Sequence, residues 1–131
     1  MNITGKITKR DDDRFLVFGY ASVADVDGNA VVDSQGDTIS IEELEKAAYD
    51  FVRFSGTGGE MHERVGVADL IESIVFTPDK LETLGLAKDA LPHSWFVGFK
   101  VTDAEVWQKI KNGDYSMFSI GGHAVRSEVN E

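Results

Sequence analysis

Residues 95–122, WFVGFKVTDAEVWQKIKNGDYSMFSIGG, contain a complete strand–helix–strand unit. The segment Trp95–Val101 is rich in aromatic and β-branched residues, which is typical of a strand. Thr102–Glu105 is a capping box, and Gly113 fits the C′ position that ends a helix. A last strand, interrupted by a double glycine, is predicted over Tyr115–Arg126. This unit indicates a sheet with helices packed beside it.

The N-terminal part of the sequence indicates two further strands. Residues 14–24 read as a strand that pairs with Ile3–Lys9 across a turn at Arg10–Asp13. The stretch Asp25–Asp37 contains aspartate, glycine, asparagine and serine and reads as a long surface loop. We therefore expect a hairpin followed by irregular chain.

The central segment predicts a helix and then extended chain. A second capping box, Ser40–Glu43, opens a helix that we expect to end near Phe54. Residues 64–76 read as a strand buried on both faces, because apolar side chains fall on both sides of it. After a turn at residues 77–80, Leu81–Ala87 is a weaker strand candidate.

These elements add up to an α+β fold that is mainly β. About six strands and two helices do not alternate regularly, so we expect a small β-barrel or curved sheet flanked by helices rather than a doubly wound sheet. A chain of 131 residues forms one domain, which we place over residues 1–131. The sequence ends soon after the double glycine with no further closing strand. We therefore expect a domain that is truncated at its C-terminus and belongs to a longer protein.

Composition excludes several classes of function. A net charge of −10 argues against a nucleic-acid partner, because a phosphate surface needs a basic face. No apolar run approaches the ~18 residues of a membrane helix, and the N-terminus does not resemble a signal peptide. The absence of cysteine removes thiolate chemistry and favours a cytoplasmic location. No histidine pair has a recognised zinc spacing, so we expect neither metal nor cofactor.

Two residues, His62 and Ser119, lie beside glycines in β-type sequence. A serine hydroxyl is a poor nucleophile until a neighbouring imidazole accepts its proton, so a Ser119–His62 pair is the sharpest catalytic hypothesis. Taken singly, each has a plainer interpretation: a loop histidine, and a small residue in a strand. The two motifs together shift the balance toward catalysis.

An acid could orient His62 from the strand predicted over residues 64–76. Side chains alternate along a strand, so Glu72 and Asp69 are expected on opposite faces, and His62 on the face of Glu72. Ten residues of extended chain span about 33 Å, so Glu72 could reach His62 only if the strand curls or bulges. The acid therefore stays open at this point.

Three segments together resemble the prohead maturation proteases of tailed phages, in particular the XkdF-like branch of prophage serine proteases. They are His62–Gly66, Trp95–Trp107 and Lys111–Gly122, and the resemblance extends from about Gly19 to Gly122. The Phe-Ser-Ile-Gly-Gly element is its most specific part.

The resemblance implies a herpesvirus-protease-like fold, in which helices surround a β-barrel, and a serine endopeptidase that cleaves scaffold and capsid precursor segments. It places the nucleophile on Ser119 and the base on His62. The third member varies among such proteases; Glu72 ranks first here, with His123 and Asp69 as alternatives. His123, four residues after Ser119, would lie about 13 Å away on a continuous strand.

Gly121 and Gly122 have two interpretations of equal weight. Their backbone N–H groups could approach a developing oxyanion, or they could form a bulge that bends a barrel strand. The expected partners are the phage scaffold and major capsid protein as substrates and a second copy in a homodimer, within proheads assembling in the host cytoplasm. The alternative function is a catalytically inactive capsid-assembly or scaffold-associated domain of the same fold.

Overall fold

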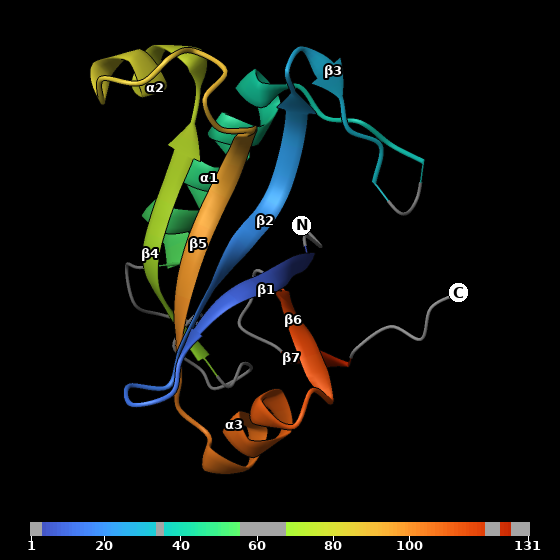
Figure 1. Cartoon of the computed structure of the whole chain (residues 1–131), viewed down its shortest axis with the longest axis vertical. Coiled ribbons are helices and arrows are strands. Elements are labelled where there is room, and N and C mark those ends of the chain that lie inside the picture. The colour runs from blue at the N-terminus through green and yellow to red at the C-terminus, as the bar shows by residue number, and fades with distance from the viewer. Residues whose placement is uncertain (1–3, 34–35, 56–67, 120–123, 127–131) are drawn as a thin grey trace.

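A computed structural model describes residues 4–33, 36–55, 68–119 and 124–126 as an α+β domain (Figure 1). The strands are β1 (Thr4–Asp11), β2 (Leu16–Val26), β3 (Asn29–Ala30), β4 (Ala68–Phe76), β5 (His93–Val101), β6 (Tyr115–Ser119) and β7 (Ala124–Arg126). The helices are α1 (Ile41–Ser55), α2 (Pro78–Thr83) and α3 (Ala104–Lys111). The described part of the chain thus has one more strand and one more helix than expected.

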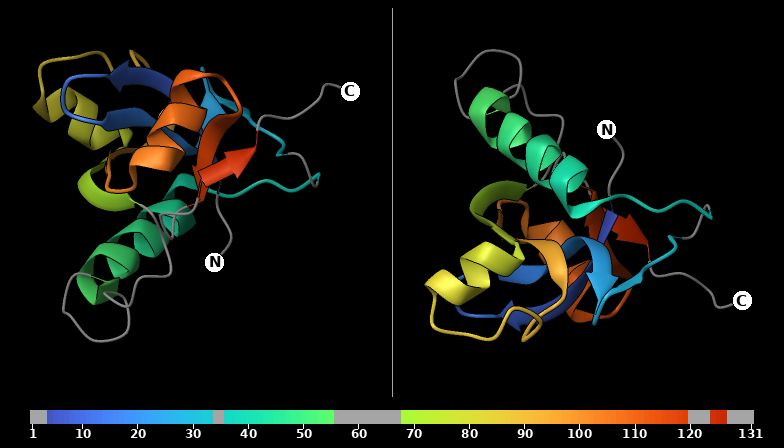
Figure 2. Two further views of the ribbon diagram at one scale, coloured as in Figure 1. Left: turned by 90° about the horizontal axis from the view of Figure 1, so that it is seen from below. Right: turned by 90° about the horizontal axis from the view of Figure 1, so that it is seen from above.

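All seven strands belong to one antiparallel sheet of order β4-β5-β2-β1-β6-β7, with the short β3 paired to β2. The described strands form an open path from β4 to β7, so closure of this sheet into a barrel stays a prediction. Figure 2 shows α1 on one side of this sheet and the β1–β2 hairpin turned toward the other.

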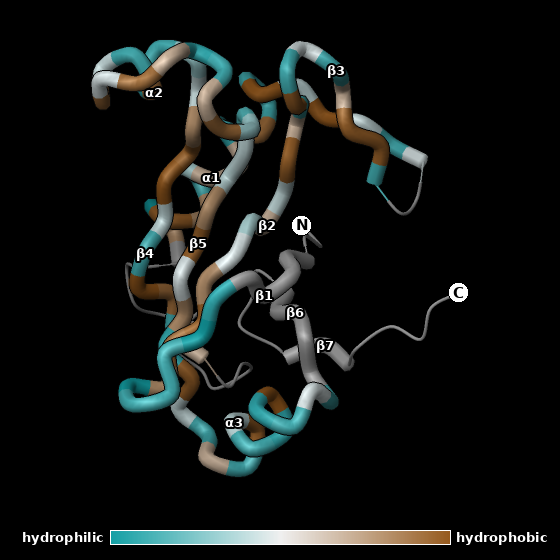
Figure 3. Tube along the Cα trace, viewed as in Figure 1, coloured by the Kyte–Doolittle hydropathy of each residue, from teal (hydrophilic) through white to brown (hydrophobic). Residues whose placement is uncertain are grey.

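The main core lies between α1 and the central strands. Leu44 and Ala48 of α1 are fully buried in one cluster with Trp95 of β5, and Phe51 meets Trp95 edge-on at 5.9 Å between ring centroids. Hydropathy follows this division, with apolar residues along β2, β4 and β5 and a hydrophilic β1–β2 turn (Figure 3). Both tryptophans of the chain, Trp95 and Trp107, are buried in this cluster.

The capping box at the start of α1 is formed as predicted. The backbone N–H of Glu43 donates to Ser40 Oγ at 3.1 Å, and the Glu43 carboxylate accepts from the Ser40 N–H at 3.3 Å. These two bonds satisfy donors that the first turn of a helix leaves free. The helix then ends within one residue of the predicted position.

Helix α3 begins one residue later than its predicted capping box. Asp103, and not Thr102, is the N-cap, because its carboxylate accepts from the N–H groups of Glu105 and Val106. Gly113 has φ +86° directly after the C-cap, which confirms the predicted end of the helix. Trp107 stacks on Phe15 at 4.8 Å between ring centroids, so α3 is anchored beside the β1–β2 turn before the chain enters β6.

The strand predicted over Leu81–Ala87 is wrong, because the chain there forms α2 and an irregular connection. Thr77 caps α2 by accepting from the Lys80 N–H at 3.1 Å, and Pro78 occupies the first turn. Proline is favoured there because its missing N–H would have no partner anyway. Leu81 is fully buried, which accounts for the apolar residue that suggested a strand.

The loop predicted over Asp25–Asp37 begins with a small hairpin. Asp25 and Val26 still belong to β2 and pair with Ala30 and Asn29 of β3. Asp27 and Gly28 both have positive φ, as a tight two-residue turn between antiparallel strands requires. Among the described residues, the loop prediction holds for 31–33 and 36–37.

None of the helices in the described ranges is long and apolar enough to cross a membrane.

Candidate active site

Ser119, the predicted nucleophile, is the last residue of β6. Its backbone pairs with Thr4 of β1, and Phe118 pairs with Gly5, so the N-terminal strand holds this end of β6. Four of the other predicted residues lie outside the described part of the chain: His62, Gly121, Gly122 and His123. The proximity of Ser119 and His62 therefore stays a prediction.

The last strand, predicted over Tyr115–Arg126 with an interruption at the double glycine, is not one strand in the structure. Instead β6 and β7 are antiparallel neighbours, with Phe118 paired to Ala124. These two strands therefore run in opposite directions. The spacing of about 13 Å between Ser119 and His123 assumed a continuous strand, so that estimate no longer applies.

Glu72 and Asp69 both lie on β4 and are exposed. Glu72 is paired with Gly98 and Asp69 with Lys100, and the register shifts between Leu70 and Glu72. This bulge inserts one residue, so the two acids share a face instead of lying on opposite faces. Face alternation therefore does not separate Glu72 from Asp69 as the partner of the base.

The expected burial of β4 on both faces is also wrong. Ile71, the extra residue at the bulge, is 45% exposed, and Ser73 is exposed as well. The reason is position in the sheet, since β4 lies at one end of the described strand order and has only β5 beside it. An end strand offers less cover to its side chains than a central one.

Between Glu72 on β4 and Ser119 on β6 lie the strands β5, β2 and β1. Neighbouring strands are ~4.8 Å apart, so this order would separate the two strands by about 19 Å in a flat sheet. The sheet is strongly twisted (Figure 2), and curvature shortens such a separation. A role for Glu72 thus requires that the sheet bend β4 toward β6.

The histidine that the structure describes, His93, forms an acid–histidine pair that sequence spacing did not indicate. Its Nδ1 lies 2.7 Å from Oδ1 of Asp25, which is 68 positions away in the chain. Its Nε2 lies 2.8 Å from the carbonyl oxygen of Lys88. Because both ring nitrogens are occupied, neither is open to accept a proton from a nucleophile, and His93 does not act as a general base here.

Burial of the ring acts to lower the pKa of His93, but hydrogen bonds to the Lys88 carbonyl and the Asp25 carboxylate outweigh it. The pKa of His93 is therefore raised above its ordinary value. A second shifted group lies at the β1–β2 turn, where a hydrogen bond from the Arg14 guanidinium lowers the pKa of Asp11. That turn is exposed, and its acids bind neighbouring Arg14 and Arg10, as expected of a solvated tip.

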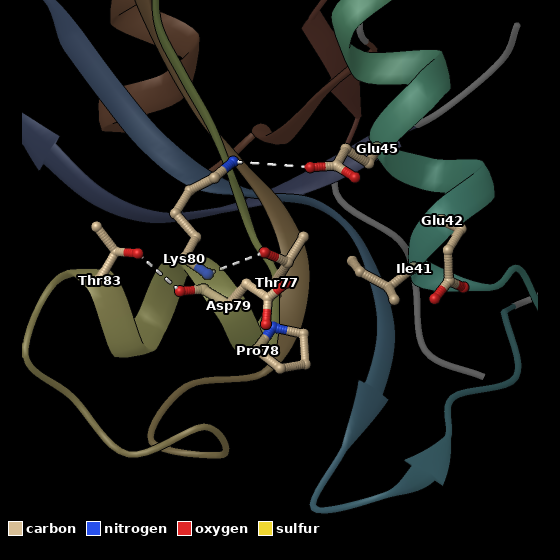
Figure 4. A pocket seen from close by; sticks show the side chains of 8 residues that line it. All are labelled: Ile41, Glu42, Glu45, Thr77, Pro78, Asp79, Lys80 and Thr83. Atoms are coloured by element: carbon tan, nitrogen blue, oxygen red, sulfur yellow. Dashed lines mark hydrogen bonds and ion pairs between the residues drawn. The ribbon is translucent and has the colours of Figure 1, made fainter.

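A cavity of about 630 Å³ lies between α2 and the start of α1 (Figure 4). Ile41, Glu42, Glu45, Thr77, Pro78, Asp79, Lys80 and Thr83 line it. Lys80 spans the two helices, with its Nζ donating to the Tyr49 hydroxyl at 2.9 Å and lying 3.9 Å from Glu45 Oε2. Of the predicted catalytic residues that the structure describes, Ser119, Glu72 and Asp69, none lines this cavity.

Residues 4–128 match the family described as "Putative phage serine protease XkdF". The chain belongs to this family. The match includes His62, Glu72 and Ser119, and it bears out the resemblance to prophage serine proteases at the level of the family.

Two relatives come from Bacillus subtilis (strain 168). Uncharacterized protein YqbD is 31% identical over 126 residues, which cover 95% of this chain and 36% of YqbD. Phage-like element PBSX protein XkdF is 30% identical over 113 residues, which cover 86% of this chain and 38% of that protein. The chain thus spans little more than a third of the length of either relative. Among solved structures, none matches this chain.

Proposed function

We propose that this chain is the catalytic domain of a serine endopeptidase that cleaves scaffold and capsid precursor segments during phage prohead maturation. The observation that carries the proposal is the family match over residues 4–128, which contains the candidate nucleophile and base. The name of one relative, a phage-like element protein, supports a setting in phage assembly.

In the proposed reaction, His62 accepts the proton of Ser119 while the serine oxygen attacks the scissile carbonyl. His62 then protonates the leaving amine, and the peptide bond breaks to give an acyl-enzyme. Water, activated by the same histidine, releases the second product and restores the serine. The N–H groups of Gly121 and Gly122 would stabilise the negative oxygen of both tetrahedral intermediates.

The backbone around Ser119 is compatible with this role. The residue ends β6, which is paired in the sheet with the N-terminal β1 on one side and with β7 on the other. A reactive residue at the end of a strand paired on both sides is held in position by a rigid scaffold.

The remaining parts of the proposal concern the third member, the fold and the assembly. We assign Glu72 as the group that orients His62, with His123 and Asp69 as the alternatives. We also propose that the curved sheet belongs to a herpesvirus-protease-like barrel, that the protein forms a homodimer, and that it acts inside proheads in the host cytoplasm.

Labelling with a fluorophosphonate probe tests the nucleophile. The wild-type chain and Ser116→Ala, which removes another hydroxyl from β6, should both be labelled, whereas Ser119→Ala should not. Circular dichroism checks that all three proteins are folded. Equal labelling of Ser119→Ala would refute the assignment, and a folded wild type that neither labels nor cleaves scaffold protein would favour the inactive assembly domain.

A further inference from the structure

His93, the first residue of β5, joins three parts of the fold. Its buried ring contacts the carboxylate of Asp25 near the end of β2 and the carbonyl of Lys88 in the connection between α2 and β5. Lys88 lies in a tight turn in which the Ala90 N–H donates to the Ala87 carbonyl at 3.1 Å. The ring therefore connects this turn to the end of β2 and the start of β5.

Both partners of the ring are hydrogen-bond acceptors. A carbonyl oxygen and an ionised carboxylate cannot donate, and a neutral imidazole carries only one N–H. The observed pair of contacts, at 2.7 and 2.8 Å, therefore fits the imidazolium form, in which both nitrogens donate. A neutral ring would place a nitrogen lone pair against one of the two oxygens.

The charged groups that act on the ring have the same sign. Asp25 approaches from β2, and Asp89 of the connection lies 3.5 Å from Nε2 through its Oδ1. Both carboxylates favour a positive ring. Asp25 makes the shorter contact and is less exposed than Asp89, so its bond to the ring should be the stronger.

We propose that His93 is a pH-operated latch that holds the connection between α2 and β5 against the end of β2 while the ring is charged. When the ring loses a proton, the remaining N–H stays with the charged Asp25, because a charge-assisted hydrogen bond is the stronger of the two. The Lys88 carbonyl then loses its donor, and the turn from Ala87 to Ala90 is released. The latch is independent of the proposed catalytic residues.

The test is a titration of the full chain labelled with ¹⁵N in its histidines. Long-range ¹H–¹⁵N spectra between pH 5 and 9 should show His93 with both nitrogens protonated at pH 6. Its midpoint should lie above that of a free imidazole, ~6.5. The His93→Gln variant assigns the signals. In parallel, the hydrogen-exchange protection factor of the Ala90 amide should fall with the same midpoint.

Two variants separate the latch from a general effect of pH. Asp25→Asn should lower both midpoints together, whereas Asp89→Asn, at the longer and more exposed contact, should move them less. A His93 that titrates at or below a free imidazole would overturn the proposal. So would an Ala90 protection factor that stays constant while His93 titrates in the wild type, a result that needs no variant.

Discussion

The indole Nε1 of Trp95 donates a hydrogen bond to Ser73 Oγ at 2.8 Å and so links β5 to β4 beside Glu72. Ser73 is exposed, whereas Trp95 is fully buried in the core. This bond therefore joins β4, an end strand of the described sheet, to Trp95, which is among the largest fully buried side chains in the described part of the chain.

Replacing Ser73 by alanine removes the acceptor of the Trp95 N–H. We expect the free energy of unfolding to fall by about 1 kcal/mol, the usual net contribution of one hydrogen bond. Urea unfolding followed by tryptophan fluorescence measures the change. Ser73→Thr keeps a hydroxyl and should retain most of the stability; an equal loss in both variants would count against the bond.

Substitution of the proposed nucleophile and base should give losses that do not add. Ser119→Ala and His62→Ala should each lower turnover by up to about 10⁶-fold, and the double variant should be no worse, because the two residues act as one unit. Cleavage of purified scaffold protein measures the rates. In the wild type, activity should fall as the pH drops through about 6 to 7, where a free imidazole gains a proton.

The third member of the site is tested by comparing variants. If Glu72 orients His62, Glu72→Gln should reduce turnover sharply with little change in KM, since it disturbs the histidine tautomer. Asp69→Asn and His123→Ala should then be mild. A reversed order, with His123→Ala the most damaging, would assign the role to His123.

Gly98 provides the space occupied by the Phe18 ring. A Cβ at this position would lie 2.8 Å from both Cδ1 and Cε1 of Phe18, which is closer than non-bonded carbon atoms approach one another. Gly98→Ala should therefore destabilise the protein by about 1–3 kcal/mol, as overpacking does. In the double variant Gly98→Ala with Phe18→Leu, the loss should be smaller than the sum of the single losses. Simple additivity would show that the ring moves aside freely.

Stability should also depend on the protonation of His93. Because its pKa is raised in the folded state, the contribution is complete below the unfolded pKa of ~6.5 and is lost as the pH rises through the folded pKa. At pH 6, His93→Gln should lose about 2 kcal/mol, as expected for a buried charged hydrogen-bonding group. Urea unfolding at pH 6 and pH 8.5 should show a wild-type decrease that the variant lacks.

Local signals predicted the parts of the fold that depend on neighbouring residues. Ser40 and Glu43 begin α1 as expected because a capping box acts within one turn. The same kind of signal was present but not used at Asp27-Gly28, a typical hairpin turn, and at Thr77-Pro78, a typical helix start. The sequence therefore contained the signals for the β2–β3 hairpin and for α2, and the predictions did not use them.

Other features depend on pairing between distant segments and could not be predicted locally. The bulge before Glu72 is a property of the register between β4 and β5, so alternation along β4 alone misplaces Asp69. The His93–Asp25 contact joins residues with no recognisable spacing. For the candidate site, Ser119 and His62 both lie in the segment that the family match covers, and their roles and their geometry stay predictions.

The pairing of Thr4 with Ser119 has a consequence for the order of events in folding. Within the described sheet, β6 reaches the other strands through β1, the first strand of the chain. A ribosome releases the serine segment only after nearly all of the domain has been made, and contacts between such distant segments form slowly. Ser119, the proposed nucleophile, would therefore take its place late, so that a nascent or N-terminally damaged chain would carry the serine without the proposed active site.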